Sequence, residues 1–233
     1  MNESAQNRSG AVVLLSGGLD STVSLAMARE YCEPRWALFF DYRQHAGERE
    51  EAASRGIAER FGLRFRCIEL PWLGDLSSSS LIAGKGVPPQ VPPGPVDGLE
   101  GAPSRAVWVE NRNGVFINIA AAFASSCGCG IVIVGFNREE ARAFPDNGEE
   151  FLKAVNGALA IGVGSPVRVE SPTLFLSKRE IVERGLTMDI PWRLIWSCYR
   201  GYDRMCGSCE SCARLRRAIA GTPAETAVVF TGG

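Results

Sequence analysis

The sequence predicts an α/β protein with a doubly wound, mostly parallel sheet. Short apolar runs rich in β-branched residues recur along the chain, and helix-like segments separate them. The first apolar run also leads directly into a glycine turn and the start of a helix. The expected strands are 11–15, 36–40, 65–70, 131–135 and 167–173, and the expected helices are 19–30, 47–61, 113–124 and 149–161.

Length and composition set the outer limits. A chain of 233 residues with 45% apolar and 22% charged residues is sufficient for one large domain, or for one domain with a small appendage. We predict a domain over 1–190 and a C-terminal region over 191–233. The net charge of -1 and a pI near 6.0 argue against a protein that binds nucleic acid or anionic lipid.

One uncharged segment, 115–136, is long enough to raise the question of a membrane span. The serines, cysteines and glycines of 125–130 divide it, so we expect a buried helix before them and a core strand after them. No signal peptide is recognisable in the polar first ten residues. The sequence therefore predicts a cytoplasmic protein with no membrane contact.

The turn after the first expected strand reads Ser16-Gly-Gly-Leu-Asp-Ser-Thr22. Glycines let the backbone approach a ligand, and the free N–H groups at a helix start bind anions, phosphate above all. Asp20, Ser21 and Thr22 add oxygens for Mg²⁺ or for helix capping. The turn has no lysine of the G-x-x-x-x-G-K-[ST] type and does not fit G-x-G-x-x-G. It resembles the S-G-G-x-D-S signature of PP-loop ATP pyrophosphatases, which split ATP between the α- and β-phosphates; the alternative is an ordinary strand-to-helix turn.

Two other segments interrupt or extend this pattern. Asp41-Tyr-Arg-Gln-His45 follows the second expected strand and places polar groups at the same edge of the sheet as the glycine turn. The segment 77–104 is rich in Ser, Pro and Gly and continues neither a helix nor a central strand. It is predicted to be either a lid near the site or a surface excursion.

Four of the eight cysteines gather near the end of the chain as Cys198-x7-Cys206-x2-Cys209-x2-Cys212. Four thiolates at this spacing suit a tetrahedral, structural Zn²⁺. An iron–sulfur cluster is the alternative, because it also takes four cysteines. Since no secretory signal is present, a disulfide framework is not expected.

The glycine turn and the cysteines together resemble one family, the 7-cyano-7-deazaguanine synthases (QueC) of the PP-loop superfamily. The similarity extends through Asp41-Tyr-Arg-Gln44, Val109-Glu-Asn-Arg-Asn113, Phe144-Pro-Asp146 with Glu150-Phe151, and Trp196-Ser-Cys-Tyr199. It covers almost the whole chain. Several positions in 139–148 depart from the family pattern, among them Glu140, where the family usually has Asp.

The resemblance implies an adenine nucleotide α-hydrolase-like fold and an ATP-dependent C–N ligase. Family members use ATP and ammonia to convert 7-carboxy-7-deazaguanine through adenylated intermediates to the nitrile 7-cyano-7-deazaguanine, a queuosine precursor. A homodimer, structural Zn²⁺ and Mg²⁺ with ATP are the expected assembly and cofactors.

The same resemblance assigns roles to individual residues. Asp20, Arg112 and Lys178 are expected to be catalytic, Phe144 and Asp146 to bind the substrate, and the four C-terminal cysteines to bind the metal. The expected ATP-binding residues are Leu15, Ser16, Gly17, Gly18, Leu19, Asp20, Ser21, Thr22, Val23, Ser24 and Leu25.

Three other functions remain open at this stage. The altered 139–148 segment suggests a related enzyme that adenylates another carboxylate or couples a deazaguanine to a protein. A PP-loop tRNA sulfur transferase would use the cysteines for an iron–sulfur cluster, although the neutral charge disfavours it. A nucleotide sensor would bind ATP without turnover.

Overall fold

The computed structural model describes residues 8–91 and 105–231. Within them a single five-stranded sheet has the order β3-β2-β1-β4-β5, and every neighbouring pair of strands is parallel. The strands are β1 (Gly10–Leu14), β2 (Glu33–Asp41), β3 (Arg64–Glu69), β4 (Ile131–Ile133) and β5 (Arg168–Glu170). The chain builds the sheet outward from β1 in one direction and then in the other, so β1 and β4 flank a topological switch point.

Helices connect and cover these strands. They are α1 (Leu19–Ala28), α2 (Gly47–Phe61), α3 (Pro71–Leu76), α5 (Arg112–Ser126), α6 (Glu140–Ala143), α7 (Glu149–Gly162), α8 (Lys178–Leu186) and α9 (Glu210–Ile219). Short 3₁₀ turns lie at Pro145–Asn147, Trp192–Leu194 and Pro223–Thr226.

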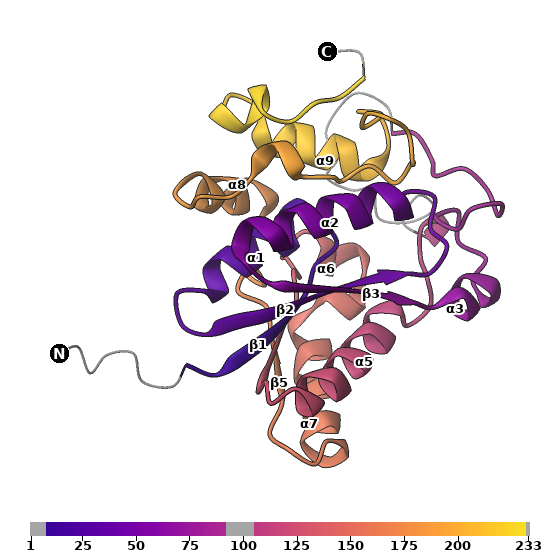
Figure 1. Cartoon of the computed structure of the whole chain (residues 1–233). Helices are drawn as coiled ribbons and strands as arrows, with labels where there is room; N and C mark the ends of the chain where they lie inside the picture. Colours follow the sequence, from indigo (N-terminus) through magenta and orange to yellow (C-terminus); the bar gives the residue numbers. More distant parts are fainter. Residues whose placement is uncertain (1–7, 92–104, 232–233) are drawn as a thin grey trace.

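The helices lie on both faces of the sheet (Figure 1). α1 and α2 cover one face, with α8 and α9 packed beyond them, while α5 and α7 cover the other. Alternation along β1 supplies both layers: Ala11 and Val13 face the first core, and Val12 faces the second. The sequence prediction of a doubly wound parallel sheet is confirmed.

Most predicted elements are present with shifted ends. Helix 47–61 has the predicted bounds, whereas β2 begins earlier than predicted and β5 is shorter. The uncharged segment 115–136 divides as expected into α5 and β4. No helix of the described residues is long and apolar enough to cross a membrane.

The C-terminal region shares its core with the rest of the chain. Cys198, Cys212 and Leu215 pack in the same apolar cluster as Ala11 and Val23. The division at residue 190 stays a prediction, since this core joins residues from both sides of it.

The described part of the proline-rich segment, 77–91, is fastened at both ends. The backbone N–H of His45 donates to Leu81 O at 2.8 Å, and that of Val91 donates to Ser208 O at 2.8 Å. Residues 92–104, on which part of the lid-or-excursion prediction rests, lie outside the described residues.

Candidate active site

A cavity of about 240 Å³ opens at the carboxyl ends of β1, β2 and β4. Its lining comes from the turn after β1, from the first turns of α1, α2 and α5, and from the segment that precedes the cysteines. The polar lining residues are Ser16, Asp20, Ser21, Gln44, Glu50, Arg112, Asn113, Glu140, Asn147, Lys178, Ser197 and Ser211. This is where ligands of open α/β sheets bind.

The turn after β1 requires glycine at position 17. Gly17 has a φ of +77°, and a Cβ there would lie 2.7 Å from the Cβ of Ala53 on α2. On the other side of the turn, a Cβ on Gly135 would lie 2.6 Å from the backbone nitrogen of Ser21. Because neither glycine has a Cβ, the start of α1 can pack closely against α2 and against the residues that follow β4.

Two serines fix the conformation of this turn. Ser21 Oγ accepts from the backbone N–H of Ser16 at 3.3 Å and lies 3.2 Å from Ser16 Oγ. Ser16 Oγ in turn accepts from the N–H of Gly18 at 3.3 Å. Because the first N–H groups of α1 have no partner within the helix, the turn presents a preformed anion site to the cavity.

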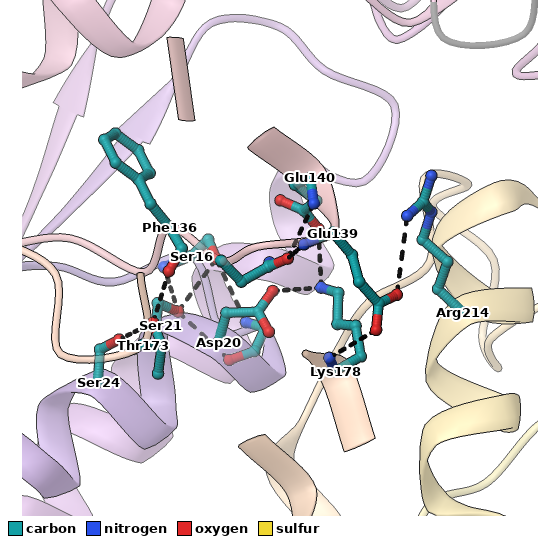
Figure 2. A network of polar contacts seen from close by, with 12 residues as sticks. Ser16, Asp20, Ser21, Ser24, Phe136, Glu139, Glu140, Thr173, Lys178 and Arg214 are labelled. Atoms are coloured by element: carbon teal, nitrogen blue, oxygen red, sulfur yellow. Dashed lines mark hydrogen bonds and ion pairs between the residues drawn. The ribbon is translucent and has the colours of Figure 1, made fainter. Parts of the chain in front are cut away.

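Lys178, at the start of α8, forms an ion pair with Asp20 and another with Glu140, the latter at 2.7 Å (Figure 2). The lysine residue is only 8% exposed. Although Lys178 lies in the first turn of α8, it is not a solvated residue, because both carboxylates contact its ammonium group. Removing Lys178 would leave both carboxylates without the cation that they share.

The three groups have altered proton affinities. Burial raises the pKa of Asp20 to about 6, although the charge of Lys178 opposes that rise. Burial acts against the charged form of Lys178, but the attraction of Asp20 and Glu140 outweighs it and raises its pKa. Glu140 keeps a lowered pKa because Lys178 outweighs the effect of burial.

The cluster continues toward α9. Glu139 accepts from the backbone N–H of Lys178 at 2.8 Å and from Arg217 at 2.6 Å, and Arg214 lies 4.0 Å from it. Arg214 also pairs at 2.9 Å with the fully buried Glu210, next to Cys209. A chain of charges therefore joins the turn after β1 (residues 16–21) to the helix that begins at the cysteines (Figure 2). We call this turn the phosphate turn because its helix-start N–H groups suit a phosphate.

Elsewhere in the cavity lining, Arg112 donates to the Tyr42 hydroxyl at 3.0 Å. The ring of Phe116 stacks on Phe40 with a centroid distance of 4.2 Å. Trp196 and Tyr199 supply further aromatic lining. The cavity thus combines a polar phosphate end with flat apolar surfaces that suit a purine-like ring.

Phe144 and Asp146 lie beside this cavity rather than among its lining residues. Phe144 stacks on Trp108 at 5.6 Å, and Asp146 accepts through its backbone oxygen from Asn113 Nδ2 at 3.2 Å. Burial raises the pKa of the Asp146 carboxyl, with the charge of Arg112 opposing it. The neighbouring Asn147 does line the cavity.

The predicted ATP-binding segment divides into two parts. Leu15, Ser16, Gly18, Leu19, Asp20 and Ser21 line the cavity. Thr22, Val23, Ser24 and Leu25 are fully buried instead, and Ser24 Oγ lies 2.8 Å from Thr173 Oγ1. The side chains of this second part hold α1 in the core.

The four C-terminal cysteines converge, with all four Sγ atoms within 4.8 Å of one another. Four sulfurs at roughly 2.3 Å from a central ion lie about 3.8 Å apart in a tetrahedron. The Sγ atoms of Cys206 and Cys212 are 3.9 Å apart, which fits that spacing. The cluster can therefore hold a metal ion.

Backbone N–H groups point at these sulfurs. Cys198 Sγ accepts from Arg200 at 3.3 Å and from Cys206 at 3.4 Å, while Cys206 Sγ accepts from Cys209 at 3.2 Å. Donors of this kind stabilise negative charge on sulfur, as metal-bound thiolates require.

Sequence reasoning missed Gln44 and Glu50 as individual site residues, although it placed the 41–45 segment at this edge of the sheet. Glu50 is one of several acidic residues in a charged helix, and no local pattern separates it from its exposed neighbour Glu48. Only the folded chain shows that Glu50 lines the cavity.

Fold and site together define a PP-loop-type α/β protein with a polar cavity and a glycine turn at its switch point. A solved structure described as a 4-thiouridine synthetase–RNA complex with bound ATP has this fold, with a TM-score of 0.51 and 19% identity over 78% of this chain and 41% of that one. The family model described as "Queuosine biosynthesis protein QueC" matches residues 10–222. The chain belongs to the QueC family, and the resemblance noted in the sequence is confirmed.

Curated relatives agree with this assignment. The chain is 50% identical to a 7-cyano-7-deazaguanine synthase of Pelotomaculum thermopropionicum over 89% of this chain and 95% of that protein. It is 43% identical to a 7-cyano-7-deazaguanine synthase of Methanosarcina mazei over 90% of this chain and 93% of that protein.

Proposed function

We propose that this protein converts 7-carboxy-7-deazaguanine and ammonia to 7-cyano-7-deazaguanine at the expense of ATP. The observation that carries the proposal is one cavity with a phosphate turn at one end and aromatic walls at the other, in a chain whose relatives have this activity in their names. The enzyme is thus an ATP-dependent C–N ligase in queuosine precursor synthesis.

The chemistry explains the need for ATP. A carboxylate is a poor electrophile because its oxygen is a poor leaving group, so attack of that oxygen on the α-phosphate first forms an acyl-adenylate and releases pyrophosphate. Ammonia displaces AMP to give the amide. A second adenylation, on the amide oxygen, allows AMP to leave again as the nitrile forms.

The turn after β1 is the proposed phosphate site. The N–H groups of Gly17, Gly18 and Leu19 would face the phosphates, with hydroxyl contacts from Ser16 and Ser21. Such groups are preorganised because the serine hydrogen bonds and the Gly17 conformation exist before ATP binds.

Arg112 and Lys178 are the proposed electrophilic groups. Both are cations in the cavity lining, and both would stabilise charge that develops on the α-phosphate. Lys178 is already held by two carboxylates, so its ammonium group has a defined position before the nucleotide arrives.

Asp146 is the proposed partner of the guanine-like edge, where one carboxylate can accept from both the ring N–H and the exocyclic amine. The structure sets Asp146 beside the cavity, with Phe144 adjacent and stacked on Trp108. Recognition by these two residues would therefore involve the short 3₁₀ turn Pro145–Asn147.

Two metals belong to the proposal. Asp20 would bind the Mg²⁺ that accompanies ATP, and its buried Oδ1 has no hydrogen-bond partner among residues 8–91 and 105–231, which fits a cation ligand. The four cysteines would hold structural Zn²⁺, whose chemistry is to cross-link the C-terminal region. Elemental analysis should find about one zinc per chain, and iron in its place would contradict this assignment.

The decisive experiment incubates the protein with ATP, Mg²⁺, ammonia and 7-carboxy-7-deazaguanine and follows the products by mass spectrometry. We expect the amide first and then the nitrile. If neither forms while a control synthase makes both, the proposal fails. Pyrophosphate release with another carboxylate would then favour a related adenylating enzyme.

The remaining partners are also proposals. We expect a homodimer, a cytoplasmic enzyme, free ammonia as the nitrogen source and no nucleic-acid partner. The tRNA sulfur transferase alternative requires an iron–sulfur cluster, so the same elemental analysis tests it.

A further inference from the structure

The proposed reaction has a strict requirement for proton removal. Nitrogen enters as ammonia with three hydrogens and leaves in the nitrile with none, so three protons must depart across the two halves of the reaction. The phosphate turn, Arg112 and Lys178 stabilise negative charge, but none of them accepts a proton readily. A base in the cavity lining is therefore missing from the assignment so far.

Three carboxylates of the described residues line the cavity, and two of them are already paired. Asp20 and Glu140 both form ion pairs with Lys178. Glu50 forms no ion pair with any described residue, and its only side-chain hydrogen bond there comes from an amide. Asp20 Oδ1 also has no hydrogen-bond partner among the described residues, but it is the proposed Mg²⁺ ligand. Glu50 is thus the lining carboxylate that is left to act as a base.

Gln44 holds Glu50 in place. The Gln44 amide is itself fixed, since its Oε1 accepts from the backbone N–H of Tyr42 at 2.9 Å and its Nε2 donates to Phe40 O at 3.1 Å. The second Nε2 hydrogen is donated to Glu50 Oε2 at 3.0 Å. One carboxylate oxygen is thereby anchored, and the other is left for a ligand.

Glu50 also lies next to the phosphate turn. A Cβ on Gly17 would lie 3.1 Å from the backbone oxygen of Glu50, so the first part of α2 packs directly against that turn. Arg112 and Tyr42 line the same cavity. Glu50 therefore shares this cavity with the phosphate site and with residues proposed to face the deazapurine.

We propose, on the basis of the proposed function, that Glu50 is the general base that removes protons from the reacting nitrogen. Burial raises the pKa of its carboxyl to about 7, against the hydrogen bond from Gln44 and the charge of Arg112. A base of that strength accepts a proton at neutral pH and returns it to water between steps.

In the first half of the reaction, the ammonia lone pair forms the C–N bond to the acyl carbon. The C–O bond to AMP then breaks, and AMP leaves with the bonding electron pair. Glu50 takes the one proton that nitrogen loses to become a neutral amide. In the second half it takes the two further protons in turn, first as the amide oxygen is adenylated and then as AMP leaves the imidate with its electron pair.

The test uses the full-length Glu50→Gln variant, which keeps the size and the acceptor oxygen that Gln44 contacts but cannot take up a proton. Three rates are compared with wild type: carboxylate-dependent ATP–pyrophosphate exchange without ammonia, amide formation with ammonia, and hydroxamate formation with hydroxylamine. The nitrogen of a hydroxylamine adduct is more acidic, so it loses its proton to water without a base. Glu48→Gln, an exposed change on the same helix, is the matched control.

We expect exchange and hydroxamate formation within a few-fold of wild type, while amide formation falls by about 10²–10⁴-fold. Amide formation near the wild-type rate would overturn the assignment. A loss of all three rates in parallel would also overturn it, because Glu50 would then support the fold or ATP binding instead. If wild type itself makes no amide or nitrile, the proposed function fails rather than this inference.

Discussion

The two ends of the cavity are built in different ways. The phosphate end is a single run, Ser16 to Ser21, that offers mainly backbone N–H groups at a helix start. The remaining lining, with Tyr42, Gln44, Glu50 and Arg112, is assembled from side chains of separate elements. A backbone site is sensitive to conformation and close approach, whereas a side-chain site is sensitive to loss of individual groups.

Lys178 is an exception to this contrast, because it adds a side-chain charge to the phosphate end. It reaches the phosphate end from 158 residues away in the sequence and is one of the few side-chain charges there. If the phosphate end depends on backbone groups alone, removal of the Lys178 ammonium group should lower the stability of the protein and leave adenylation unchanged. If charge is also needed there, adenylation should fall as well.

The largest effect is expected for Lys178→Met. Because Asp20 and Glu140 would be left buried without their cation, the free energy of unfolding should fall by about 3–5 kcal/mol near pH 8. The loss should be smaller at pH 5, where both carboxylates can protonate. Urea denaturation at the two pH values measures this.

Lys153→Met is the control for that variant. Lys153 pairs with Glu149 on the surface, with 71% of its side chain exposed, so its loss should change stability by less than about 1 kcal/mol. Equal losses for the two variants would show that the buried cluster contributes nothing special.

An intermediate effect on stability is expected for Glu50→Gln, and its size should depend on pH. The folded protein binds a proton at Glu50 more tightly than the unfolded chain does, since its pKa is about 7 in the fold. The protonated Glu50 carboxyl therefore contributes to the free energy of unfolding of the wild type at low pH. This contribution is lost as the pH rises from about 4.3 to 7.

Glutamine does not titrate, so the free energy of unfolding of the variant should rise relative to that of the wild type by up to about 3 kcal/mol across that pH range. Above about pH 7 the difference should stay constant. Arg112, Asp41 and Cys198 also influence this carboxyl, and they are the same in both proteins. Paired denaturation curves from pH 5 to 8 provide the measurement. A stability difference that does not vary with pH would contradict the raised pKa.

Of the three variants, Gly17→Ala is expected to have the smallest effect on stability. Its effect on ATP–pyrophosphate exchange should be large. A left-handed residue costs about 1–2 kcal/mol when it gains a Cβ. Gly62→Ala is a matched control, because Gly62 has a φ of +72° and a Cβ added there would meet nothing within 4 Å, whereas one on Gly17 would contact Ala53.

Both glycine variants should lose the stability that the left-handed backbone costs, and Gly17→Ala should lose more because its Cβ also contacts Ala53. Only Gly17→Ala should lose ATP–pyrophosphate exchange, by about 10²-fold through displacement of the turn. Equal exchange rates in the two variants would show that the close packing of α2 on the turn is unimportant for the phosphate site.

Sequence patterns predicted the sheet and four of its principal helices because hydrophobic periodicity and glycine punctuation are local signals. They failed for side chains whose environment depends on distant contacts. Arg214 belongs to a run rich in arginine that is typical of a solvated helix face, yet it is 8% exposed and paired with Glu210. Nothing in the order of residues distinguishes such an arginine from an exposed one.

By itself the sequence determined the parallel α/β fold, the glycine turn before the first helix and the grouping of the four cysteines, since each depends on residues near one another in the chain. Only the tertiary structure decided that Lys178 is buried between Asp20 and Glu140, that Phe144 and Asp146 stand beside the cavity, and that Glu50 faces into it. The physical reason is that burial and ion pairing depend on which elements meet at the edge of the sheet. Chain folding sets those meetings, and no local motif records them.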